Sequence, residues 1–68
     1  MSNMLQNSDG FTVGDDILIL GQEFRGFVGK VVGIRILPEM PSPLFCIKIS
    51  GVETDKFAVF RKEGIQKI

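Results

Sequence analysis

Hydrophobic and polar residues alternate along several short segments of the chain, which is the pattern of half-buried β-strands. Residues 44–50 (LFCIKIS) show it most clearly, because Phe45, Ile47 and Ile49 fall on one face of an extended chain. Residues 16–20 (DILIL) instead place apolar side chains on both faces. The pattern predicts a strand in each of these two segments and three further strands, over residues 30–37, 56–60 and 65–68.

Glycine and proline residues separate the predicted strands. The pair Gly14-Asp15 predicts a turn before the first strand, in which Asp15 bonds nearby backbone amides. A loop with three glycines follows over residues 21–29, and the three prolines of residues 38–43 exclude a central strand there. Gly33, inside the second strand, predicts a bulge or a sharp bend.

Five short strands with turns at this spacing predict an all-β fold, a small antiparallel barrel over residues 11–68. About one helical turn is expected over residues 61–64, before the last strand. Residues 1–10 (MSNMLQNSDG) are polar and without period, which predicts a disordered N-terminal lead. The apolar residues that alternate along the strands are predicted to form most of the core: Val13, Ile17, Ile19, Val31, Ile34, Phe45, Ile47, Ile49, Phe57, Val59 and Ile65.

The composition favours strands over helices. Ile, Val and Phe dominate the apolar residues, whereas alanine occurs once, at Ala58. Cys46 is the single cysteine and histidine is absent, which excludes a disulfide framework and a zinc site of the usual Cys/His kind. We therefore expect no metal and no cofactor, and Cys46 is expected to be a buried, unreactive thiol.

The charges cancel, since eight Lys and Arg residues balance eight Asp and Glu residues. Proteins that bind nucleic acid by neutralising phosphates usually carry a positive excess, so binding to RNA is expected to be weak. No apolar run is long enough to cross a bilayer, and residues 1–10 lack the features of a signal peptide. These features predict a cytoplasmic protein.

Residues 13–19 (VGDDILI) and 26–31 (GFVGKV) together resemble the KOW motif, which ends in Gly-x-x-Gly-x-Val. KOW domains occur in transcription elongation factors of the NusG and Spt families and in several ribosomal proteins. The loop over residues 24–29 (FRGFVG), with two aromatic residues around its glycine, is most similar to the NusG type. In this motif Gly26 and Gly29 are expected to adopt positive φ, and Val31 is expected to enter the core.

The resemblance implies a five-stranded SH3-like barrel that acts as a non-enzymatic binding module. It implies docking on transcription or translation machinery, through RNA polymerase, a ribosomal protein or another large complex, by a chain that is monomeric when isolated. Residues 56–65 (KFAVFRKEGI) also resemble the ends of SH3-like subunits from photosynthetic electron-transfer complexes. That second resemblance implies the alternative function, a small regulatory subunit of a photosynthetic or redox complex.

The loop between the first two predicted strands is the candidate partner-binding site. Phe24 and Phe27 are candidate anchors, with Arg25 at their rim, because aromatic residues and arginine dominate interface energetics. The alternative is that one or both rings cap the open end of the barrel. Lys30 and Arg35 extend the site, and together with Arg25 they are basic residues of the first hairpin that could contact RNA phosphates, or else are ordinary solvated charges. If the rings are a cap, the next candidate surface lies around Phe60, Arg61 and Lys62.

Catalysis is not expected of this chain. Asp15 and Asp16 are adjacent on an extended segment, so their side chains point to opposite faces and cannot act as a paired acid and base. The sequence contains no histidine, no tyrosine and no phosphate-binding Gly-Lys-Ser/Thr run. The P-x-x-P match at residues 38–41 is explained by a proline-rich hairpin loop and needs no ligand role.

Overall fold

The computed structural model describes residues 3–51, 54 and 56–68. Over these residues the protein is built from β-strands and two short 3₁₀ turns, so the predicted all-β, antiparallel architecture is confirmed. The elements in chain order are β1 (Asn3–Leu5), β2 (Asn7–Ser8), β3 (Phe11–Thr12), β4 (Asp16–Ile19), η1 (Gln22–Phe24), β5 (Val28–Ile36), β6 (Leu44–Ile49), β7 (Lys56–Phe60), η2 (Lys62–Gly64) and β8 (Ile65–Lys67).

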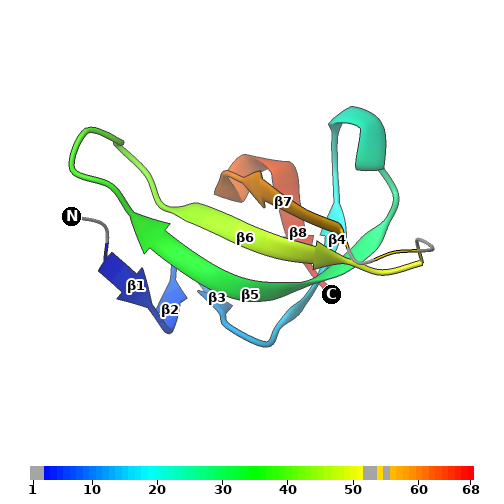
Figure 1. Cartoon of the computed structure of the whole chain (residues 1–68), viewed down its shortest axis with the longest axis horizontal. Helices are drawn as coiled ribbons and strands as arrows, with labels where there is room; N and C mark the ends of the chain where they lie inside the picture. Colours follow the sequence, from blue (N-terminus) through cyan, green and yellow to red (C-terminus); the bar gives the residue numbers. More distant parts are fainter. Residues whose placement is uncertain (1–2, 52–53, 55) are drawn as a thin grey trace.

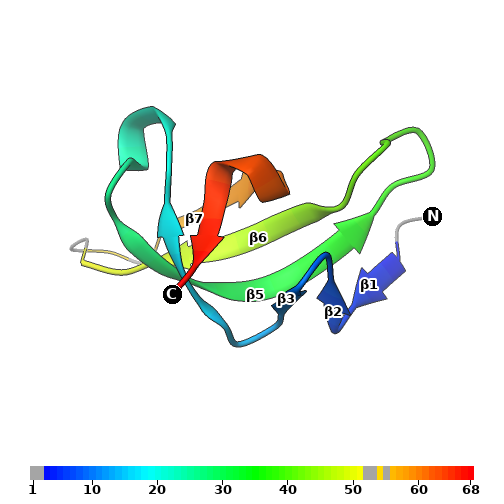
Figure 2. The ribbon, with the colours of Figure 1, turned by 180° about the vertical axis from the view of Figure 1, so that it is seen from behind.

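One antiparallel sheet contains most of these strands, in the order β7-β6-β5-β4-β8. The long strand β5 is its centre: it pairs with β6 along most of its length, with β4 at its start and with β1 at its end. Figures 1 and 2 show the β5–β6 hairpin running along the longest axis, with β4, β7 and β8 around one end of β5. Strands β2 and β3 form a separate pair beside β5.

Gly33 marks a bulge in β5, as the sequence predicts. Val31 pairs with Ile47 and Gly33 with Cys46, so Val32 is the extra residue between two successive pairs. A bulge bends the strand that carries it and increases its twist. The bend allows the two halves of β5 to use different neighbours, β4 first and β1 afterwards.

The core lies on the concave side of this sheet and agrees with most of the predicted list. Eight apolar side chains are almost fully buried: Ile17, Ile19, Val31, Ile34, Phe45, Ile47, Ile49 and Ile65. Val13 is half-buried and packs against them. Phe57 and Val59 were also predicted to be core residues, and this is wrong, because they are 58% and 59% exposed. Their neighbours Ala58 and Phe60 pack against the core instead, since both faces of this strand are apolar and register decides between them.

The start of the chain also differs from the sequence-based expectation. Residues 3–10, expected to be an unstructured lead, contribute β1 and β2. Leu5 packs against the core, and the ring of Phe11 lies 5.0 Å from that of Phe45 at an interplanar angle of 59°. The physical reason is the bent second half of β5, whose free edge is available for β1 once β4 has diverged. Residues 1 and 2 of the predicted lead lie outside the described residues.

Candidate functional site

Strands β5, β6 and β7 share a face that points away from the core. Residues paired across antiparallel strands lie on the same face of the sheet. Gly33 pairs with Cys46, and Cys46 pairs with Val59, so these three residues form a row across the strands. Lys48 and Phe57 are a second cross-strand pair on this face, one repeat further along. We call this surface the outer face.

The outer face carries several exposed apolar side chains. Phe57 and Val59 on β7 are 58% and 59% exposed, and Val32, at the bulge of β5, is 39% exposed. Leu44 and Cys46 on β6 are half-buried between them. Five apolar or weakly polar side chains therefore gather on one surface of a small protein. Such patches typically mark interaction sites when they are contiguous.

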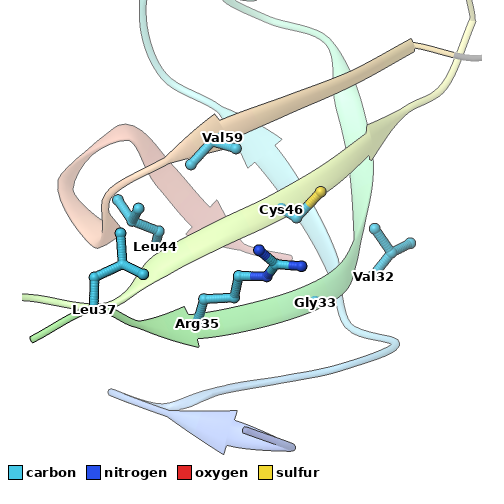
Figure 3. Close-up of a pocket in the computed structure, with 7 residues that line it drawn as sticks. All are labelled: Val32, Gly33, Arg35, Leu37, Leu44, Cys46 and Val59. Carbon is cyan, nitrogen blue, oxygen red and sulfur yellow. The ribbon is translucent and has the colours of Figure 1, made fainter. Parts of the chain in front are cut away.

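A hollow of about 390 Å³ lies on the outer face (Figure 3). Gly33 has no side chain and Cys46 has a short one, so these two residues leave room for it. Figure 3 shows Val32 at one end of the hollow and the Leu37–Leu44 pair at the other. Its lining residues come from all three strands and the start of the hairpin loop: Val32, Gly33, Arg35, Leu37, Leu44, Cys46 and Val59.

Among the described residues that line the hollow, Arg35 is the one with a charged side chain. Its side chain is exposed and runs over the sheet toward Cys46 (Figure 3). It makes no hydrogen bond or ion pair with any described residue. By contrast, Lys30 lies 3.4 Å from Asp16, measured from Nζ to Oδ1. Arg35 therefore offers a guanidinium whose donors are available to another molecule.

A second hollow, of about 420 Å³, adjoins the first. The two share Leu44 and Val59, which form the ridge between them. Phe60 and Arg61, two of the residues named by sequence as the fallback surface, line this second hollow, whereas Lys62 instead lies 3.7 Å from Asp9. The remaining lining residues of the second hollow are Met40, Glu63 and Gly64.

The predicted site loop is ordered and partly packed inward. Phe24 is half-buried and contacts the core, as the capping alternative predicts for one of the rings. Phe27 is 37% exposed, and its ring meets that of Phe24 edge to face at 6.0 Å. Gly26 adopts φ +90° and its amide donates to the carbonyl oxygen of Ile19 at 2.8 Å, which closes the loop. Arg25, between the rings, is exposed.

The structure does not bring the five predicted partner-binding residues together. Phe24, Arg25 and Phe27 belong to the loop, whereas Lys30, at the start of β5, pairs with Lys48 of the outer face and lies against Asp16. Arg35 lies five residues further along β5, which is roughly 16 Å in an extended strand. It therefore belongs to the outer face and not to the loop.

Sequence reasoning missed the outer face as a site, although one signal for it was present. Residues 56–60 (KFAVF) carry apolar side chains on both faces, so one of the two sets had to remain outside a core this small. The alternation along one strand does not say which set is outside. The structure places Phe57 and Val59 there, and it also places Cys46, expected to be buried, half-buried on that face.

Asp15 performs the predicted turn role. Its carboxylate accepts a hydrogen bond from the backbone amide of Thr12 at 2.9 Å and lies 3.4 Å from Nζ of Lys67. The Thr12 amide, followed by the Lys67 ammonium, holds the pKa of Asp15 below its ordinary value, although partial burial opposes the shift. The Asp15 carboxylate, whose pKa is lowered, therefore stabilises the turn that it forms with Thr12.

The described residues contain neither a cluster of metal-ligating side chains nor a membrane-spanning helix. No three His, Cys, Asp or Glu side chains among them converge as metal ligands would. No helix in the same residues has the length and hydropathy needed to span a bilayer.

No protein-family model, curated protein or solved structure matches the chain. Its function is therefore inferred from the geometry and chemistry of the outer face.

Proposed function

We propose that this chain is a non-enzymatic binding module that contacts a protein partner through the outer face of β5, β6 and β7. The observation that carries the proposal is the row Gly33–Cys46–Val59, where small or apolar residues of three strands line a hollow on the side of the sheet away from the core. Covering such a surface removes apolar area from water, which stabilises a complex by about 25 cal/mol per Å² before the costs of association.

We further propose that the module is an SH3-like barrel of the KOW type. Three observations support this assignment: the five-strand path β7-β6-β5-β4-β8, the turn η2 between its two end strands, and two of the three motif residues. Gly26 has positive φ and Val31 is fully buried, whereas Gly29 lacks the positive φ that the motif led us to expect. On this assignment the partner belongs to cytoplasmic transcription or translation machinery, such as RNA polymerase or a ribosomal protein, and the isolated chain is a monomer.

The alternative function, a regulatory subunit of a photosynthetic or redox complex, uses the same surface. Its supporting resemblance covers residues 56–65, which contain the exposed strand residues Phe57 and Val59. The two functions differ in the partner, so the identity of the partner separates them. The loop tip with Arg25 and Phe27 remains a second candidate contact region, because both side chains are exposed.

A comparative capture experiment tests the proposed function. The tagged wild-type protein and a Phe57→Thr/Val59→Thr variant are incubated with lysate of the source cells, and the bound proteins are quantified by mass spectrometry. Threonine keeps the strand propensity of both positions while removing apolar surface. A Leu20→Thr/Ile68→Thr variant is the matched control, because it changes two apolar residues that are 40% and 65% exposed elsewhere.

The proposed function predicts a partner that the wild type and the control capture and the outer-face variant loses. Recovery of polymerase or ribosomal proteins supports the transcription or translation assignment, whereas recovery of a redox complex supports the alternative. If the outer-face variant captures the same proteins as the wild type in the same amounts, the face is not the contact surface.

A further inference from the structure

We propose that the hollow on the outer face accepts a segment of the partner protein in which a large apolar side chain lies next to an acidic one. The inference rests on the proposed function and names the chemistry of what binds there. The apolar side chain would occupy the hollow over Gly33 and Cys46, and the carboxylate would pair with Arg35.

The size and lining of the hollow favour an apolar side chain. Its volume of about 390 Å³ lies in the lower part of the range of about 300–1,000 Å³ that is typical of ligand pockets. Val32, Leu37, Leu44 and Val59 supply its walls, and no described residue fills it. A large aliphatic or aromatic residue of a partner is the group that gains most from such a place, since buried aromatic anchors dominate many interfaces.

Arg35 requires that the partner also supply an anion. Any partner that covers the hollow removes water from the Arg35 guanidinium, which has no counter-charge in the described part of the chain. A buried, unpaired charge is costly, whereas a carboxylate can accept two parallel hydrogen bonds from a guanidinium. The partner segment is therefore expected to be acidic beside its apolar anchor.

The same argument disfavours a second copy of this chain as the occupant. In a symmetric dimer the same patch is used on both subunits, so each Arg35 would have to find its anion on the outer face of the partner subunit. The lining of this hollow contains no carboxylate among the described residues to offset them. Like charges brought together at an interface are unfavourable.

The test is a peptide selection in which the charge of one residue is reversed. A display library of random nine-residue peptides is selected on the immobilised wild-type protein, on Arg35→Glu and on Lys56→Glu. Lys56→Glu is the matched control, because it makes the same charge change at another exposed basic residue that has no ion pair with a described residue. Thermal unfolding of each variant shows that it is folded before selection.

The inference predicts that wild type and Lys56→Glu enrich peptides with Asp or Glu beside a large apolar residue. Arg35→Glu should enrich Lys or Arg at that place. For a synthetic peptide from the wild-type selection, Arg35→Gln should raise the dissociation constant by roughly tenfold or more, because a charge-assisted hydrogen bond is lost. The peptide should also slow alkylation of Cys46, the single cysteine, which lines the hollow.

Five results would overturn the inference. Peptides that protect Cys46 but show no acidic preference, or that bind Arg35→Glu as well as they bind the wild type, contradict the proposed acidic residue. They remain compatible with the proposed function. Selected peptides that do not protect Cys46 count against the outer face itself. A selection that enriches no peptide excludes a short linear segment, and a wild-type dimer whose Cys46 is protected at micromolar concentration assigns the hollow to a second copy.

Discussion

Gly29 lies at the start of β5, where the opposite strand approaches too closely for a side chain. A Cβ atom at this position would lie 2.5 Å from the Ile47 side chain and 2.9 Å from the backbone oxygen of Lys48. The motif resemblance led us to expect positive φ at both Gly26 and Gly29, and only Gly26 has it. The second glycine is needed for close packing and not for a turn.

Replacing Gly29 by alanine should therefore destabilise the protein. Overpacking of this kind costs roughly 1–3 kcal/mol, a large share of the stability of so small a domain. Urea unfolding measures the change. Gly21→Ala is the control, since a Cβ there meets no atom within 4 Å and its φ is not positive. Equal stability of Gly29→Ala and the wild type would mean that β5 and β6 are further apart at this point.

Asp15 gives the protein a contribution to stability that depends on pH. Because its pKa is lowered in the folded state, chiefly by the Thr12 amide, folding favours the ionised carboxylate. The contribution is complete above the unfolded pKa of about 3.9 and is lost as the pH falls through the lower, folded pKa. The wild type should be more stable than Asp15→Asn at pH 7, and this difference should shrink below about pH 4.

Urea unfolding of both proteins at several pH values measures this difference. Asp16→Asn is a suitable comparison, because Asp16 is exposed and ion-paired but its carboxylate accepts no hydrogen bond from a described backbone amide. A difference between wild type and Asp15→Asn that stays constant from pH 7 to pH 2.5 would contradict the role of the ionised carboxylate.

At the scale of single elements, β7 is where the sequence was least informative. Residues 44–50 have one apolar face, so their orientation followed from alternation alone and Phe45, Ile47 and Ile49 are buried as predicted. Residues 56–60 have two apolar faces, and their orientation depends on which residue of β6 each one pairs with. Pairing register is a tertiary property, and a slip of one residue exchanges the two faces.

The register of β7 can be tested with two phenylalanines of the same strand. Phe60 pairs with Phe45 and packs against the core, whereas Phe57 is 58% exposed. Phe60→Ala should therefore lower the free energy of unfolding by roughly 2–4 kcal/mol, and Phe57→Ala by less than about 1 kcal/mol. Chemical denaturation compares them. The reverse order would show that β7 presents its other face to the core.

The loop over residues 21–27 shows a different limit of prediction. Its glycines and aromatic residues were correctly placed in a connection between strands, but the sequence left open whether the rings are exposed or packed. The structure divides them, since Phe24 contacts the core and Phe27 stays partly exposed against it. That division depends on how the loop packs against the core, a tertiary property that no local sequence pattern contains.

At the scale of the whole molecule, the distribution of charge argues against tight binding to nucleic acid. The net charge is zero, and Lys30, Lys62 and Lys67 each lie within 4 Å of an aspartate. Few uncompensated cations remain to release counterions from phosphates. Titration with single-stranded RNA and duplex DNA at near-physiological salt should give dissociation constants above about 1 μM. Submicromolar binding would favour an RNA-binding function through the first hairpin.

The central claim, that the outer face is the contact surface, is tested most directly by amide chemical-shift mapping. The ¹⁵N-labelled wild-type protein is titrated with the partner recovered in the capture experiment, and shift changes are assigned to residues. The account predicts the largest changes within residues 32–37, 44–46 and 57–59, the strand segments that carry the side chains of the outer face. The largest changes at residues 24–27, with the outer face unaffected, would contradict it and return the site to the aromatic loop.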